Sequence, residues 1–130
     1  SHEQEGARHS ARNIRFLPHE APVFRGISRT VAATLSAGTS ESELLERFTD
    51  AYGDCPLIEV RPDIPEVREV RNTHSIIIGG FTVSANDPRR VSIVEVLDNL
   101  LNGAATQAVQ NLNLAFSLDP LAGLKLPSEP

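Results

Sequence analysis

Two β-rich runs joined by a short turn constrain the fold of this chain most. Residues 74–85, HSIIIGGFTVSA, and residues 89–98, RRVSIVEVLD, are each long enough for a strand. The sequence between them, 86–88, is Asn-Asp-Pro, which favours a turn. The two runs are therefore predicted to pair as an antiparallel hairpin. Glycine weakens a strand interior, so Gly79 and Gly80 predict a break or a β-bulge in the first run.

A helix over 41–52 is the best-marked element before the hairpin. Ser40 and Glu43 have the spacing of a capping box, and apolar residues recur at helical spacing until Gly53. Alternating apolar residues predict three further strands, at 13–18, 27–38 and 57–61.

The segment 62–73, PDIPEVREVRNT, is predicted to be extended or turned, because Pro62 and Pro65 disfavour a helix. Strands followed by helices, without repeated βαβ alternation, indicate the α+β class. We expect a mostly antiparallel sheet with helices packed on one face.

A last helix is predicted over 103–116, with Asn102 as its N-cap. One stripe of this helix is apolar and should face the sheet; it comprises Ala104, Ala105, Ala108, Val109, Leu112, Ala115 and Phe116. An ordinary packing helix explains this pattern. A second interpretation is that the small residues of the first turn expose backbone N–H groups to an anionic or amide-bearing ligand, flanked by Asp98 and Asn99.

Composition limits the possible partners. The 130 residues suffice for one domain, and the net charge of −5 without a basic run disfavours nucleic acid and membrane surfaces. The chain contains no methionine, which suggests a piece of something longer, and its single cysteine, Cys55, fits a reducing compartment. The histidines lack metal-ligand spacing, so no metal site is predicted.

The loop FLPHEAPVFRG brings His19 and Arg25 close together between two predicted strands. Arginine suits bidentate binding of a carboxylate or phosphate. An anion site in this loop and an ordinary surface arginine are equally compatible with the residues alone.

Three long segments, in order, resemble the C-terminal part of N-acetyl-gamma-glutamyl-phosphate reductases, which are related to aspartate-semialdehyde dehydrogenases. They are FLPHEAPVFRGISRTV, IPEVREVRNTHSIIIGGF and VLDNLLNGAATQAVQNLNLAF. The resemblance implies the C-terminal domain of a glyceraldehyde-3-phosphate-dehydrogenase-like fold. It also implies that 1–130 is a single domain from a two-domain reductase, whose Rossmann domain with the nucleophilic cysteine lies outside this chain.

The family converts N-acetyl-5-glutamyl phosphate to the semialdehyde with NADPH in arginine biosynthesis. The resemblance makes His2 the catalytic acid/base, places His19 and Arg25 against the substrate, and places Asn99 and Gly103 near the cofactor. It further implies a homo-oligomer in the cytoplasm, or in the mitochondrion of a fungus. The family usually has lysine at the position of Asn102.

Two other functions remain open at this level. The chain could be a non-catalytic dimerisation module, or it could belong to a related acyl-phosphate reductase of the aspartate-semialdehyde type with another substrate. Arg25 would bind many carboxylates equally well.

Overall fold

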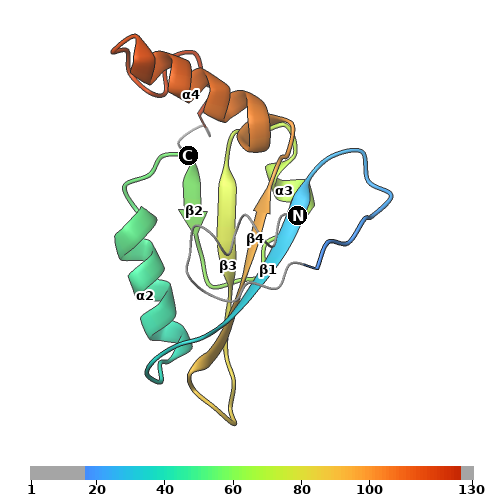
Figure 1. Cartoon of the computed structure of the whole chain (residues 1–130), viewed down its shortest axis with the longest axis vertical. Helices are drawn as coiled ribbons and strands as arrows, with labels where there is room; N and C mark the ends of the chain where they lie inside the picture. Colours follow the sequence, from blue (N-terminus) through green and yellow to red (C-terminus); the bar gives the residue numbers. More distant parts are fainter. Residues whose placement is uncertain (1–16, 127–130) are drawn as a thin grey trace.

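The computed structural model describes residues 17–126, which form a four-stranded sheet with helices around it (Figure 1). The strands are β1 (Ile27–Thr34), β2 (Ile58–Val60), β3 (Ile76–Val83) and β4 (Arg90–Leu97). The helices are α2 (Glu41–Tyr52), α3 (Val67–Val70), the π-helix η1 (Leu101–Ala105) and α4 (Thr106–Ala115).

The sheet has the order β1-β4-β3-β2 and is antiparallel except for the β2–β3 pair. The predicted hairpin is confirmed as β3 and β4, and β1 pairs with β4 along its whole length. The short β2 runs parallel to β3, and α3 lies in the connection between them. The α+β class and the mostly antiparallel sheet are therefore confirmed.

The helix predicted over 41–52 is confirmed with the same bounds. Its capping box is formed: Ser40 Oγ accepts the N–H of Glu43, and Glu43 Oε2 accepts the N–H of Ser40. Leu44 of α2 packs with Ile78 and Phe81 in the larger core cluster.

Helices pack on both faces of the sheet, where one covered face was predicted. Ile77 and Val96 point away from α2 and pack with Val67 and Val70 of α3. The prediction of no helix in 62–73 was wrong for Val67–Val70, which form α3. Pro62 and Pro65 lie before the helical turn, where proline does no harm, and Glu69 accepts the N–H of Glu66 to cap it.

Strand boundaries differ modestly from the prediction. β1 stops at Thr34 instead of near Gly38, and β2 covers only the centre of 57–61. Most of the predicted strand at 13–18 lies outside the described residues, and Leu17 and Pro18 are not in a strand.

The bulge predicted at the glycine pair is confirmed and sets which side chains enter the core. The β3–β4 register shifts between Gly79 and Thr82, so Phe81 joins Ile78 on the α2 face although strict alternation would send it to the other face. Gly80 has φ of +61°, and its N–H donates to the carbonyl oxygens of Pro62 and Asp63. The bulge thus lets the backbone of Pro62 and Asp63, which follow β2, approach β3 closely.

Gly79 should be intolerant of a side chain. A Cβ there would lie 2.2 Å from the carbonyl oxygen of Asp63, so Gly79→Ala must displace backbone. We expect a loss of about 1–3 kcal/mol of unfolding free energy, measured by urea denaturation. Gly123→Ala is the control, because Gly123 has φ of +78° but a Cβ added there would meet no atom of residues 17–126 within 4 Å. Its loss of about 1–2 kcal/mol would come from backbone strain alone, and Gly79→Ala should lose more. An unchanged stability of Gly79→Ala would show that the backbone at Asp63 can move away from β3 without cost.

Candidate active site

The carboxylate of Asp98 organises one end of the sheet. β4 ends at Leu97, and the next residue, Asp98, has no exposed surface. Arg25 contacts both of its oxygens: Nη2 donates to Oδ1 at 2.8 Å, and Nε lies 2.7 Å from Oδ2 as an ionic contact. The backbone N–H of Asn72 donates to Oδ2 at 2.8 Å. One buried carboxylate therefore joins the loop before β1, the turn after α3 and the end of β4.

Asp98 also caps the following helix. Its Oδ1 accepts the N–H groups of Leu100 and Leu101, at 3.0 and 3.2 Å, while its backbone oxygen accepts from Leu101 and Gly103. The prediction that Asn102 is the N-cap was wrong, because Asn102 lies inside η1, whose N-cap position is Leu100. The side chain that accepts the first N–H groups is that of Asp98, two residues before Leu100. Three N–H groups near the start of the helix are thereby occupied within the chain, and the helix begins with a π-turn.

These contacts also act on the protonation of Asp98. Burial works to raise the pKa of the carboxyl, but hydrogen bonds from Arg25 and from the N–H groups of Asn72, Leu100 and Leu101 outweigh burial and hold the pKa below its ordinary value. Asp98 is therefore ionised at neutral pH and forms a partly buried ion pair with Arg25, whose side chain is 16% exposed.

Asn99 continues the same turn and contacts the same loop. Its Oδ1 accepts the N–H of Gly26 at 2.7 Å, so the carboxamide is held by its oxygen. Among the hydrogen bonds of the described residues, none uses its amide nitrogen, which carries two N–H donors. Gly26 has φ of +112°, and a Cβ there would lie 2.1 Å from a methyl of Val67. The position thus requires glycine.

Gly103 lies one turn further on and has room for a small side chain. A Cβ would lie 3.4 Å from Leu97 and 3.7 Å from Asn99, which is ordinary contact. A glycine inside a helix costs about 0.5–1 kcal/mol relative to alanine. The contacts within residues 17–126 would allow alanine at this position, so they do not explain why it is glycine.

The face that the last helix turns inward is polar, contrary to the predicted apolar stripe. Asn102, Thr106 and Asn113 are buried, whereas Leu112 and Phe116 are exposed. Thr106 Oγ1 is hydrogen-bonded to Nδ1 of His74 at 2.7 Å, and Asn102 donates to the carbonyl oxygen of His74. The helix crosses the end of the sheet instead of lying on it (Figure 1), so its inward face meets backbone carbonyls and polar turns.

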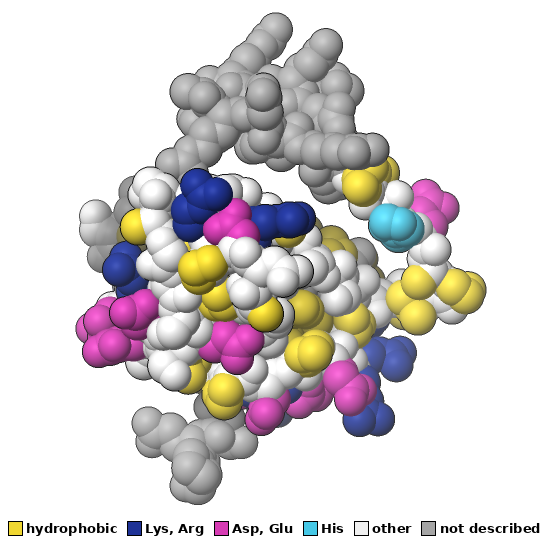
Figure 2. Space-filling model, turned by 90° about the horizontal axis from the view of Figure 1, so that it is seen from below, with side chains coloured by type: hydrophobic (Ala, Val, Ile, Leu, Met, Phe, Trp, Pro, Cys, Tyr) yellow, Lys and Arg dark blue, Asp and Glu magenta, His cyan; other side chains and the backbone are white. Residues whose placement is uncertain are grey.

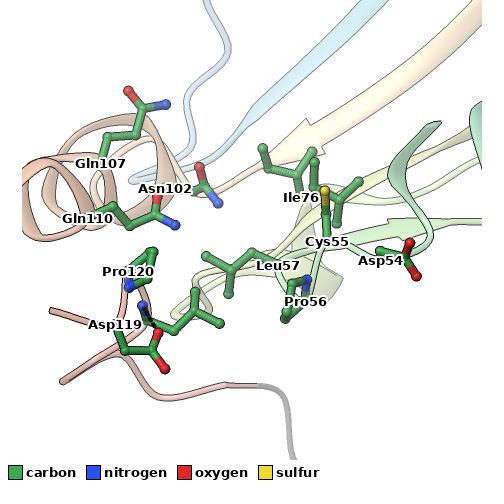
Figure 3. Close-up of a pocket in the computed structure, with 12 residues that line it drawn as sticks. Asp54, Cys55, Pro56, Leu57, Ile76, Asn102, Gln107, Gln110, Asp119 and Pro120 are labelled. Carbon is green, nitrogen blue, oxygen red and sulfur yellow. Dashed lines mark hydrogen bonds between the residues drawn. The ribbon is translucent and has the colours of Figure 1, made fainter. Parts of the chain in front are cut away.

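A pocket of about 420 Å³ lies beside this helix (Figure 3). Leu57 and Ile76 form an apolar wall, and Asn102 and Gln110 approach it from the helix side, with Pro120 nearby. His19, Arg25, Asn99 and Gly103 do not line it. The pocket and the Asp98 turn are therefore separate features of the same end of the domain.

The structure brings three of the predicted site residues together. Arg25, Asn99 and Gly103 meet around Asp98. His19 is exposed and lies in the segment before β1, which projects from the body of the domain (Figure 1). His2 lies outside the described residues. The substrate contact predicted for Arg25 stays a prediction, because Asp98 and the Oδ1 of Asn72 hold its guanidinium.

Two residues of this arrangement were not recognised from the sequence. Asp98 was expected to flank a ligand, and its pairing with Arg25 was missed. Asn72 was missed altogether, although an asparagine after a short helix is a usual residue for the left-handed conformation that it adopts, with φ of 63°. The sequence separation of 73 residues between Arg25 and Asp98 conceals their contact.

Comparison with known proteins decides the family. Residues 1–99 match the family of the semialdehyde dehydrogenase dimerisation domain. The chain belongs to this family. This semialdehyde dehydrogenase domain is 43% identical, over 95% of its length, to N-acetyl-gamma-glutamyl-phosphate reductase of Xanthomonas campestris pv. campestris, strain B100, and covers 39% of that protein. It is 40% identical over 96% of its length to the Dictyostelium discoideum bifunctional protein argC, mitochondrial, and covers 14% of it.

Solved structures agree with the fold. The semialdehyde dehydrogenase domain superposes on aspartate semialdehyde dehydrogenase II of Vibrio cholerae with a TM-score of 0.60 and 26% identity, over 74% of this chain and 28% of that one. A probable aspartate-semialdehyde dehydrogenase from Pseudomonas aeruginosa gives 0.62 and 27%, over 75% and 30%. The chain thus spans less than half the length of the proteins that it matches, and the resemblance to this superfamily found in the sequence is confirmed.

The charge of Asp98 should contribute to stability above its unfolded-state pKa. The folded-state pKa is lowered, so this contribution is present above about pH 4 and is lost as the pH falls through the folded-state pKa. Asp98→Asn should cost about 3–5 kcal/mol of unfolding free energy at pH 7, because it leaves Arg25 without its anion. The difference from wild type should shrink below pH 4, as urea unfolding at several pH values would show.

Asp87→Asn is the matched control for this measurement. Arg89 lowers the pKa of Asp87 in the exposed hairpin turn, but solvent screens that pair. The control should show no comparable loss. A difference between Asp98→Asn and wild type that stays constant from pH 7 to pH 3 would contradict a stabilising role of the Asp98 charge.

Proposed function

We propose that this chain is the catalytic and dimerisation domain of a longer reductase that converts N-acetyl-5-glutamyl phosphate to N-acetylglutamate 5-semialdehyde in arginine biosynthesis. The observation that carries the proposal is the 43% identity, over 95% of the chain, to a protein named N-acetyl-gamma-glutamyl-phosphate reductase. The meeting of the Arg25 loop and the Asn99 turn at one end of the sheet supports it.

In this proposal a cysteine in a separate nucleotide-binding domain attacks the acyl phosphate. A carbon–sulfur bond forms, and phosphate leaves. NADPH, when bound, supplies the hydride that reduces the resulting thioester, and the thiolate leaves to give the aldehyde. His2 serves as the acid/base that accepts the proton of the thiol and manages protons at the carbonyl oxygen. His19 contacts the substrate from the exposed loop.

Two residues of this chain fit the nicotinamide end of NADPH. The amide nitrogen of Asn99 has donors to offer, while its oxygen is fixed by Gly26. Gly103 leaves space beside it that the described residues do not fill. Both lie on the same turn, so a carboxamide of the cofactor could be bound by Asn99 while the backbone at Gly103 permits close approach.

The surface of the last helix supports a partner domain. Four apolar side chains at its C-terminal end are each more than half exposed, which is unfavourable unless another surface buries them. They are Leu112, Leu114, Phe116 and Leu118. We propose that the Rossmann domain of the same protein packs there, close to the turn of Asn99 and Gly103.

The sheet supports a second partner. All eight residues of β1 are exposed. α2 contacts β2 and β3, and its core cluster extends to Val91 and Ile93 of β4 but includes no residue of β1. The uncovered positions on the α2 side include Ile27 and Val31 of β1. We propose that a second copy of the protein packs on this face, as the name of the family suggests.

The relatives, together with the surface of the domain, suggest a cellular compartment. No helix within residues 17–126 is long and apolar enough to cross a membrane, and these residues contain no cluster of potential metal ligands. On the face seen in Figure 2, acidic, basic and hydrophobic side chains alternate. With bacterial relatives and one named as mitochondrial, we propose the cytoplasm, or the mitochondrion in a eukaryote.

The activity is tested in the protein that carries the upstream domain. It should oxidise N-acetylglutamate 5-semialdehyde with NADP in a reaction that depends on phosphate. His2→Asn should lower kcat by about 100-fold or more, since general acid/base groups contribute about that factor, with NADPH affinity unchanged. His19→Asn should instead raise KM for the acyl phosphate. Phosphate-dependent oxidation of aspartate semialdehyde alone would assign another substrate, and no oxidation of either would favour a non-catalytic dimerisation module.

Gly103→Ala tests cofactor binding without disturbing the fold. The added methyl meets only ordinary contacts within the described residues, so the melting temperature should stay the same or rise. The Kd for NADPH should increase by about tenfold because the methyl occupies the space assigned to the cofactor. Gly38→Ala, at the other end of β1, is a control that should leave the Kd unchanged. Equal NADPH binding by Gly103→Ala and wild type would refute the placement of the cofactor at this turn.

A further inference from the structure

The Arg25–Asp98 pair connects two segments to which the proposed function gives different tasks. The loop before β1 carries His19 toward the substrate, and the turn after β4 carries Asn99 and Gly103 toward the cofactor. Between them, Arg25 Nη2 and Nε lie 2.8 and 2.7 Å from the two oxygens of Asp98. The β1–β4 ladder ends at the pair of Ile27 and Leu97. The Arg25–Asp98 pair extends the contact between the two segments beyond that end, by side chains alone.

A second hydrogen bond fixes the orientation of this connection. Gly26 follows Arg25 and donates its N–H to Oδ1 of Asn99, which follows Asp98. Two consecutive residues of the loop are therefore held by two consecutive residues of the turn. The hydrogen bond from Gly26 holds the oxygen of the Asn99 carboxamide, and Arg25, the residue before Gly26, is held in turn by Asp98.

All three nitrogens of the guanidinium already have a neighbour within this chain. Nη1 donates to Oδ1 of Asn72 at 2.7 Å, and the other two nitrogens face Asp98. To bind a substrate carboxylate through its Nε and Nη2 edge, Arg25 would have to leave Asp98, which has no exposed surface and would become a buried unpaired anion. The resting arrangement therefore favours an indirect role.

We infer that Arg25 is a positioning residue that acts through Asp98: the buried pair holds the substrate loop and the Asn99 turn in one register, so that occupancy of one site depends on the other. This inference rests on the proposed function. It predicts that a change in the loop at Arg25 alters NADPH affinity although Arg25 itself does not contact NADPH, and that Asp98 is required for the effect.

The test measures the Kd for NADPH by fluorescence titration in the full-length protein, at a temperature well below the melting point of every variant. Arg25→Gln and Asp98→Asn should each weaken binding by about tenfold. The double variant should also lose about tenfold and not a hundredfold, because both changes break the same pair. Arg25→Lys keeps the charge and should recover part of the affinity. Arg89→Gln removes a similar arginine, paired with Asp87 in the β3–β4 turn, and should change nothing.

A milder variant keeps the test decisive if Arg25→Gln does not fold. Asn72→Gly removes the carboxamide that accepts from Arg25, keeps the backbone N–H that donates to Asp98, and tolerates the φ of 63° at this position. It should weaken NADPH binding by about threefold. A Kd equal to that of the wild type would overturn the inference.

The other outcomes separate the inference from the proposed function. If Arg25→Gln raises only KM for the acyl phosphate and leaves the Kd for NADPH unchanged, Arg25 binds the substrate directly. If it lowers the melting temperature but not NADPH affinity, the pair is merely structural. Either result overturns the inference while the proposed function stands. If the wild-type protein does not bind NADPH at all, the proposed function itself fails.

Discussion

The buried carboxylate of Asp98 is the interaction on which the functional end of this domain depends. A charge without exposed surface is tolerable only if hydrogen bonds and an opposite charge replace its lost hydration. Arg25 and three backbone N–H groups provide them, and each donor comes from a segment that must then stay in place. The need to satisfy one anion therefore fixes a loop, a turn and the start of a helix together.

The β-bulge has a comparable effect on the core. One extra residue at the glycine pair reverses the alternation of β3, so Phe81 packs against α2 with Ile78. The same bulge lets the chain after β2 approach the sheet closely, since Gly80 donates to Pro62 and Asp63. The segment that leads into α3 and on to Asn72 is thus positioned by the sheet, and Asn72 in turn reaches Asp98.

The last helix shows how its location changes the meaning of a hydrophobic pattern. Its polar residues Asn102 and Thr106 bind His74, and its apolar residues face outward. An amphipathic helix normally turns its apolar face to its own core. Here that face is left exposed, and it is the surface on which we propose that a second domain packs.

The sequence by itself determined the elements whose signals are local. The hairpin, the bulge at Gly79 and Gly80, and the capped helix after Ser40 follow from spacing and turn chemistry within a few residues, and the long motifs identify the superfamily. Only the tertiary structure decided that Arg25 pairs with Asp98, that Asp98 and not Asn102 caps the last helix, and that this helix presents its apolar face outward. These depend on contacts between distant residues and on burial, which neither periodicity nor composition records.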